Sequence, residues 1–119
     1  MLWLLAWFLV WLAFYWPWAT GALTIPWDGK AQFAPQVQFL AKSFARGELP
    51  LWTPNVFAGH PQVADPQSML FSPPFVLLAL ADPAPGPWII DSVVFAMLFI
   101  AGIFIALFTR DLGWHGATG

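Results

Sequence analysis

The sequence predicts an all-α membrane protein in which two transmembrane helices flank a long loop that carries an amphipathic helix. Of the 119 residues, 60% are hydrophobic and only 8% are charged, whereas a soluble domain carries roughly 25% charged residues. One long apolar segment lies near each end of the chain, and prolines repeatedly interrupt the sequence between them. This small number of charged residues cannot cover the surface of a soluble globule. Lipid is therefore expected to surround much of the protein surface.

The first predicted transmembrane helix covers residues 1–25. From Leu2 onward it contains no charged residue, and at about 1.5 Å per residue it exceeds the roughly 30 Å hydrocarbon core. Aromatic residues crowd its far end, where amphipathic rings favour the headgroup level: Tyr15, Trp16, Trp18 and Trp27. A cleaved signal peptide is the alternative, with its cleavage site at the small residues 19–22. An uncleaved helix is favoured, because no Lys or Arg precedes the apolar run and the run is longer than a signal core of about 7–15 residues.

The second predicted transmembrane helix covers residues 88–109, and Asp91 is its only charged residue. An ionisable group inside a span indicates function by default, but Asp91 lies close enough to the interface for a structural role to be equally favoured. Gly102 and Ala106 form a small-xxx-small pair, which permits close approach of another helix; the alternative, equally favoured, is the ordinary composition of a membrane helix, which tolerates Gly and Ala. Residues 110–119 are predicted to be a short turn. Since two helices bury little surface in lipid, the chain is expected to be the N-terminal part of a larger protein.

The loop between the spans, residues 26–74, contains one predicted helix at residues 35–46. Its apolar stripe comprises Phe33, Val37, Leu40, Ala41 and Phe44, and its polar stripe comprises Gln38, Lys42 and Arg46. Pro35 suits a first turn and Gly47 suits a C-terminal cap. Such a helix is expected to lie along the membrane surface with its apolar stripe toward lipid.

The remainder of the loop is expected to be an ordered coil held by its aromatic residues, because its prolines forbid a long helix. Segment 75–87 is apolar at first but is interrupted by Asp82-Pro83. It is too short to cross a bilayer, so we expect it to lie at the interface or to dip into the membrane and return.

Several classes of function are disfavoured by composition. The net charge is −2 and the four Lys and Arg residues are scattered, so no basic patch indicates nucleic acid as a partner. There is no cysteine, which excludes disulfides and thiolate metal sites. No Gly-rich phosphate loop, Rossmann fingerprint or nucleophile motif is present.

Asp28 is the first candidate for chemistry. It follows the first span in the sequence Pro26-Trp27-Asp28-Gly29-Lys30, at the depth of lipid headgroups. Neighbouring tryptophan, Lys30 or a metal ion could tune its carboxylate as a base. The alternative is a solvated carboxylate that ends a helix.

His60 and Asp65 are the next candidates. Together with Asp28 they could ligate a divalent cation, although no HxxxH or HExxH spacing is present. The alternative for Asp65 is an Asx turn before Pro66. Glu48, beside the Gly47 turn, is expected to be exposed.

Several segments taken in order resemble the YfhO-like membrane proteins, which belong to the GT-C type of polytopic glycosyltransferases. They are Asp28-Gly29, the run GELPLWTPNVFAGHP at 47–61, ADPQS at 64–68, FSPP at 71–74 and RDLG at 110–113. The resemblance covers nearly the whole chain. The family usually has Asn at position 53, an aromatic residue at 55 and Tyr at 72, where this chain has Thr53, Asn55 and Ser72.

The resemblance implies the N-terminal part of a polytopic GT-C-like fold in the cytoplasmic membrane. The amino terminus and residues 110–119 would be inside and the loop 26–87 outside, although a bare count of positive charges favours the opposite. It further implies sugar transfer from a polyprenyl-phosphate donor to an acceptor hydroxyl, with Asp28 as the catalytic base. The expected partners are the bilayer, the lipid-linked sugar and the remaining transmembrane helices.

The candidates for substrate binding are Trp52, His60, Asp65 and Gln67 of the matching segments, and Lys30, which directly follows the first of them. A divalent cation is a candidate cofactor, because the leaving phosphate needs a positive partner. Two other functions stay open. The chain could belong to a transport or lipid-handling protein without transfer chemistry, or it could be a small structural protein with two membrane helices.

Overall fold

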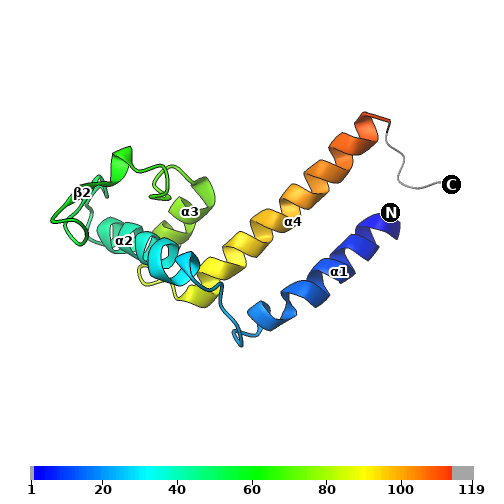
Figure 1. Cartoon of the computed structure of the whole chain (residues 1–119), viewed down its shortest axis with the longest axis horizontal. Coiled ribbons are helices and arrows are strands. Elements are labelled where there is room, and N and C mark those ends of the chain that lie inside the picture. Colours follow the sequence, from blue (N-terminus) through cyan, green and yellow to red (C-terminus); the bar gives the residue numbers. More distant parts are fainter. Residues whose placement is uncertain (1, 114–119) are drawn as a thin grey trace.

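The computed structural model describes residues 2–113 and is mostly helical. In chain order its elements are α1 (Leu2–Ala19), the π-helix η1 (Gly29–Phe33), α2 (Ala34–Ala45), β1 (Trp52–Thr53), β2 (His60–Pro61), the 3-10 helix η2 (Gln62–Ala64), α3 (Pro73–Ala81) and α4 (Pro87–Asp111). Figure 1 shows α1 and α4 running side by side in opposite directions. The elements between them form a lobe beside the first turns of α4.

Helix α4 is the one helix within residues 2–113 that is long and apolar enough to cross a membrane. Its 25 residues extend over about 37 Å. Pro87 occupies the first turn, where a missing N–H costs nothing, and Gly113 follows its end with a left-handed backbone. The helix thus contains the whole predicted span, 88–109.

Helix α1 is shorter than the span predicted over residues 1–25. It has 18 residues, or about 27 Å. It ends at Ala19 because the Thr20 hydroxyl donates back to the Pro17 carbonyl at 3.0 Å and Gly21 turns the chain with a φ of 72°. Residues 22–25 continue without regular structure.

Aromatic side chains join α1 to α4. Phe8 and Trp11 contact Phe99, with ring centroids 5.9 and 4.8 Å apart, and Tyr15 and Trp18 contact Phe95, each at 5.0 Å. The Tyr15 hydroxyl donates to Ser92 Oγ at 2.8 Å, and Trp88 Nε1 donates to the Ala19 carbonyl at 2.9 Å.

The Trp7 side chain of α1 packs directly on Gly102 of α4, where a Cβ atom would overlap its indole. Gly102 of the predicted small-residue pair therefore accepts a side chain of α1.

Helix α2 lies within one residue of the predicted bounds, 35–46. Gly47 ends it with a φ of 72°, while the amides of Gly47 and Glu48 donate to the carbonyls of Phe44 and Ser43, which is a Schellman motif. The apolar stripe of α2 does not face lipid as expected. Val37, Leu40 and Ala41 are fully buried, because α3 packs directly on them.

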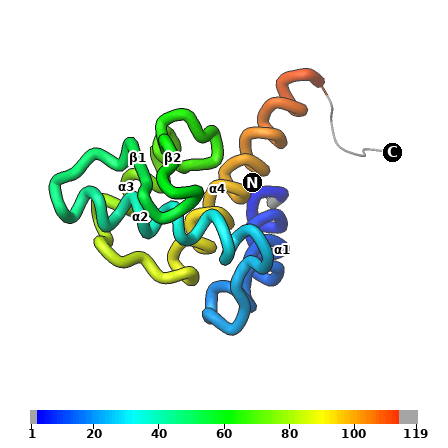
Figure 2. Tube along the Cα trace, turned by 60° about the vertical axis from the view of Figure 1, so that its left-hand side comes forward, coloured from blue at the N-terminus to red at the C-terminus, as the bar shows by residue number. Residues whose placement is uncertain are grey.

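The segment from 48 to 72 folds back over α2 (Figure 2), with β1 and β2 paired antiparallel. Its aromatic side chains do not form its interior as expected: Trp52, Phe57 and Phe71 are 57%, 90% and 74% exposed. Uncharged polar side chains are buried instead, namely Thr53, Gln62 and Ser68. Side-chain hydrogen bonds to the backbone order its turns: Thr53, Asp65 and Ser68 accept the amides of Asn55, Gln67 and Leu70.

Candidate functional site

A groove of about 680 Å³ separates the start of α2 from the segment that folds back over it. One wall consists of helical side chains four residues apart, Asp28, Gln32 and Gln36. The opposite wall includes His60, Asp65 and further polar residues from the folded-back segment, Asn55, Gln62 and Gln67. Carboxylate, amide and imidazole groups therefore converge on one open space.

A strained turn holds Asp28 at the edge of this groove. Trp27 has a φ of 56°, and its carbonyl accepts the amides of Lys30 and Ala31 at 3.1 and 2.9 Å. Asp28 itself has a helical backbone and precedes η1, but its side chain makes no capping hydrogen bond. Its carboxylate is exposed and so is open to a ligand.

A second groove, of about 450 Å³, lies on the other side of Asp28. Its lining is mostly apolar and includes Phe33, Phe75, Ile90 and Val94, with the two carboxylates Asp28 and Asp91 among them. Asp28 is the charged residue that lines both grooves. A polar space and an apolar space therefore meet at one carboxylate, beside the first turns of α4.

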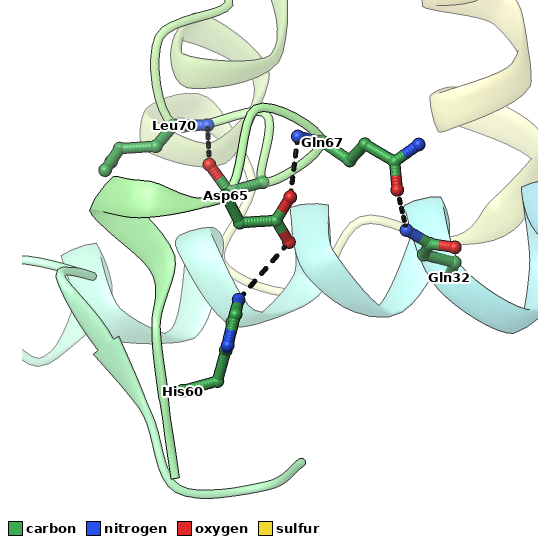
Figure 3. Close-up of polar contacts among 6 residues, drawn as sticks. Gln32, His60, Asp65, Gln67 and Leu70 are labelled. Atoms are coloured by element: carbon green, nitrogen blue, oxygen red, sulfur yellow. Dashed lines mark hydrogen bonds and ion pairs between the residues drawn. The ribbon is translucent and has the colours of Figure 1, made fainter. Parts of the chain in front are cut away.

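The His60 imidazole and the Asp65 carboxylate face each other in the polar groove, with 3.6 Å between Nε2 and Oδ2 (Figure 3), an ion pair when the imidazole is protonated. The other oxygen of Asp65 accepts the Gln67 amide at 2.8 Å. Asp65 therefore forms the predicted Asx turn and also places a carboxylate beside the His60 imidazole. The His60 side chain is one third exposed, so a ligand in the groove can reach it.

A side-chain hydrogen bond ties the two walls of the groove together. Gln32 Nε2 donates to Gln67 Oε1 at 2.5 Å (Figure 3). Since Asp65 holds the Gln67 backbone and Gln32 lies one turn after Asp28, this bond links the His60–Asp65 pair to the helix that begins at Asp28.

The remaining predicted site residues lie elsewhere. Lys30 is exposed and is absent from the lining of both grooves. Trp52 lies over Gly59, where a Cβ atom would come within 2.5 Å of its ring, and it also does not line the polar groove.

Within residues 2–113, no group of three or more His, Asp or Glu side chains is placed to hold a metal ion. The structure therefore does not bring Asp28, His60 and Asp65 together as one group of three ligands.

Asp91 has a structural partner. It is 6% exposed, and its Oδ2 accepts the backbone amide of Ile25 at 2.9 Å. The bond fixes the end of the connection from α1 to Asp28 against the second turn of α4.

Gln32, Gln36 and Asn55 were not expected in the site. The signal for the two glutamines was in the sequence, because Asp28, Gln32 and Gln36 recur at helical spacing. The Oε1 atom of Gln36 is buried without a hydrogen-bond partner in the described part of the chain. No comparable signal marks Asn55, which reaches the groove only through the β1–β2 turn.

Comparison of the chain with protein-family models, with curated proteins and with solved structures finds no match.

Proposed function

We propose that this chain is the N-terminal part of a polytopic membrane glycosyltransferase, and that Asp28 is its catalytic base. The enzyme transfers a sugar from a polyprenyl-phosphate donor to an acceptor hydroxyl outside the cytoplasmic membrane. The observation that carries the proposal is the position of the Asp28 carboxylate where the polar and apolar grooves meet. A lipid-linked sugar has the same division, with a polar head on an apolar chain.

In this mechanism the sugar and the acceptor occupy the polar groove, and the first part of the lipid lies in the apolar groove. The acceptor oxygen attacks the anomeric carbon as its proton passes to Asp28. The bond between that carbon and the phosphate oxygen breaks, and the lipid phosphate leaves with the electron pair. The cations that stabilise this phosphate come from the remaining helices, because no Lys or Arg lines either groove.

Two local features support a functional role for this region. The turn at Asp28 leads into a π-helix, Gly29–Phe33, and single π-helical turns are frequent at functional sites. The His60–Asp65 pair and the amides of the groove provide directional hydrogen bonds of the kind that orient hydroxyl groups.

The decisive experiment replaces Asp28 with Asn in the complete protein, reconstituted in liposomes with a polyprenyl phosphate that carries radiolabelled hexose. Loss of a base lowers the rate by about 10²- to 10⁴-fold, so transfer should nearly vanish while the amide keeps the shape of the site. Glu48→Gln is the matched control, because Glu48 is an exposed carboxylate paired with Arg46 and lies outside both grooves. If the Asp28→Asn variant transfers the sugar at the wild-type rate, Asp28 is not the catalytic base.

A lipid-handling protein without transfer chemistry is the second candidate, and the apolar groove is the observation that favours it. In that case the wild-type protein and the Asp28→Asn variant should bind the polyprenyl phosphate equally well. Neither form should release the sugar to an acceptor.

A further inference from the structure

The two helices of the lobe differ in what they leave exposed. Helix α2 buries its apolar stripe against α3, and its exposed side carries Lys42 and Arg46. Helix α3 is apolar both on the side that packs against the protein and on its exposed side. Phe75 and Ala79 are buried against α2 and α4, while Leu77 and Leu80 are 66% and 63% exposed.

The exposed side of α3 lacks the composition of a surface that meets water. All nine residues of Pro73–Ala81 have apolar side chains, and no charged residue occurs from 66 to 81. Interfaces with soluble proteins have a polar rim around their apolar centre. Leu77 and Leu80 have no such rim along their own helix.

The buried side of α3 packs against α4, the helix that is long and apolar enough to cross a membrane. Phe75 and Leu78 pack in one cluster with Ile90 and Val94, so α3 lies beside the first two turns of α4 (Figure 1). Trp88, at the start of α4, is half exposed, and exposed tryptophans mark the headgroup level in membrane proteins. A helix beside residues 90–94 therefore lies at the depth where acyl chains begin.

We propose that α3 is embedded in the bilayer leaflet in which α4 begins, with Leu77 and Leu80 against lipid acyl chains. Helix α2 lies above it, shielded from lipid by α3, with Lys42 and Arg46 toward water. With nine residues, or about 13 Å, α3 enters one leaflet and does not cross. The chain thus contacts lipid through a third element besides α1 and α4.

The absence of cysteine from the chain allows a direct test with single-cysteine variants. Leu77→Cys and Leu80→Cys are labelled with a nitroxide in the 119-residue chain, reconstituted in phosphatidylcholine liposomes. Leu49→Cys is the matched control, because Leu49 is also a highly exposed leucine but follows α2. Collision rates with oxygen, which concentrates in lipid, and with a water-soluble nickel chelate are then measured by electron paramagnetic resonance. Far-UV circular dichroism verifies that each variant retains its helices.

The ratio of oxygen to nickel collisions should be several-fold higher at positions 77 and 80 than at position 49. Equal ratios at the three positions would show that α3 faces water and would overturn the proposal. Low collision rates with both reagents at 77 and 80 would also overturn it, because protein from a second copy or another segment would then cover this side.

Discussion

Four residues other than glycine within residues 2–113 have a left-handed backbone: Trp27, Phe57, Ala58 and Met69, with φ between 51° and 59°. Each such conformation costs on the order of 1–3 kcal/mol and persists only where the surroundings enforce it. Trp27 precedes Asp28, and Phe57 and Ala58 lie in the turn that leads to His60. The strain is therefore concentrated next to the two groups on which the candidate site depends, as it is at many functional sites.

Gly59 should be the most sensitive glycine of the site. Its φ of 118° is closed to residues with a side chain, and a Cβ atom would come within 2.5 Å of the Trp52 ring. We expect Gly59→Ala to cost about 1–3 kcal/mol and to shift the imidazole resonances of His60. Thermal unfolding in detergent and NMR spectroscopy measure the two effects.

Gly47→Ala is the control for Gly59→Ala. Gly47 also has a positive φ, but nothing lies within 4 Å of the position that a Cβ atom would occupy there, so only the backbone cost applies. His60 resonances should stay unchanged in this variant. Identical spectra for the two variants would show that the turn at Gly59 does not position His60.

Asp91 should matter as a hydrogen-bond acceptor. Asp91→Leu leaves the partly buried amide of Ile25 without a partner, which costs about 1–3 kcal/mol, whereas Asp91→Asn retains an oxygen. Amide hydrogen exchange at Ile25 should accelerate in the leucine variant and much less in the asparagine variant. Equal acceleration in both would mean that the negative charge, and not the acceptor, holds this connection.

At the scale of elements, Gly102 sets the distance between α1 and α4. Gly102→Leu should force the Trp7 indole away and cost about 1–3 kcal/mol as an overpacked contact. The near-UV circular dichroism of the aromatic cluster between the helices should weaken accordingly. Ala101→Leu is the matched control, because Ala101 is the adjacent residue and is exposed. A spectrum of Gly102→Leu equal to that of Ala101→Leu would argue against the tight pairing.

Local sequence signals predicted where the elements lie better than they predicted what packs against those elements. The stripe from Val37 to Phe44 and the cap at Gly47 located α2 because both act within a few residues. The apolar stripe could not indicate which surface covers it, because burial against lipid and burial against α3 both remove the same apolar side chains from water. The groove was equally hidden: His60, Asp65 and Gln67 are close in sequence, but their approach to Gln32 depends on how the whole segment from 48 to 72 folds back.

At the scale of the whole molecule, the orientation across the membrane decides whether Asp28 can meet an extracytoplasmic substrate. Two arguments oppose each other. The lobe carries Lys30, Lys42 and Arg46 and the far end of α4 carries Arg110, which favours the lobe inside by the positive-inside rule. The proposed function requires the lobe outside. Helix α4 spans about 37 Å, enough to cross the roughly 30 Å core, so its two ends should face opposite compartments in either case.

Single cysteines at three exposed positions separate these arguments: Leu49 in the lobe, Leu112 after α4 and Trp3 in α1. We expect a membrane-impermeant maleimide to label Leu49→Cys in intact spheroplasts, and to label Leu112→Cys only after permeabilisation. Trp3→Cys should behave as Leu112→Cys does, because α1 pairs antiparallel with α4 from Trp7–Gly102 to Tyr15–Ser92. The reverse labelling pattern would place Asp28 in the cytoplasm and contradict the proposed function. Labelling of positions 49 and 112 from the same side would mean that α4 does not cross the membrane.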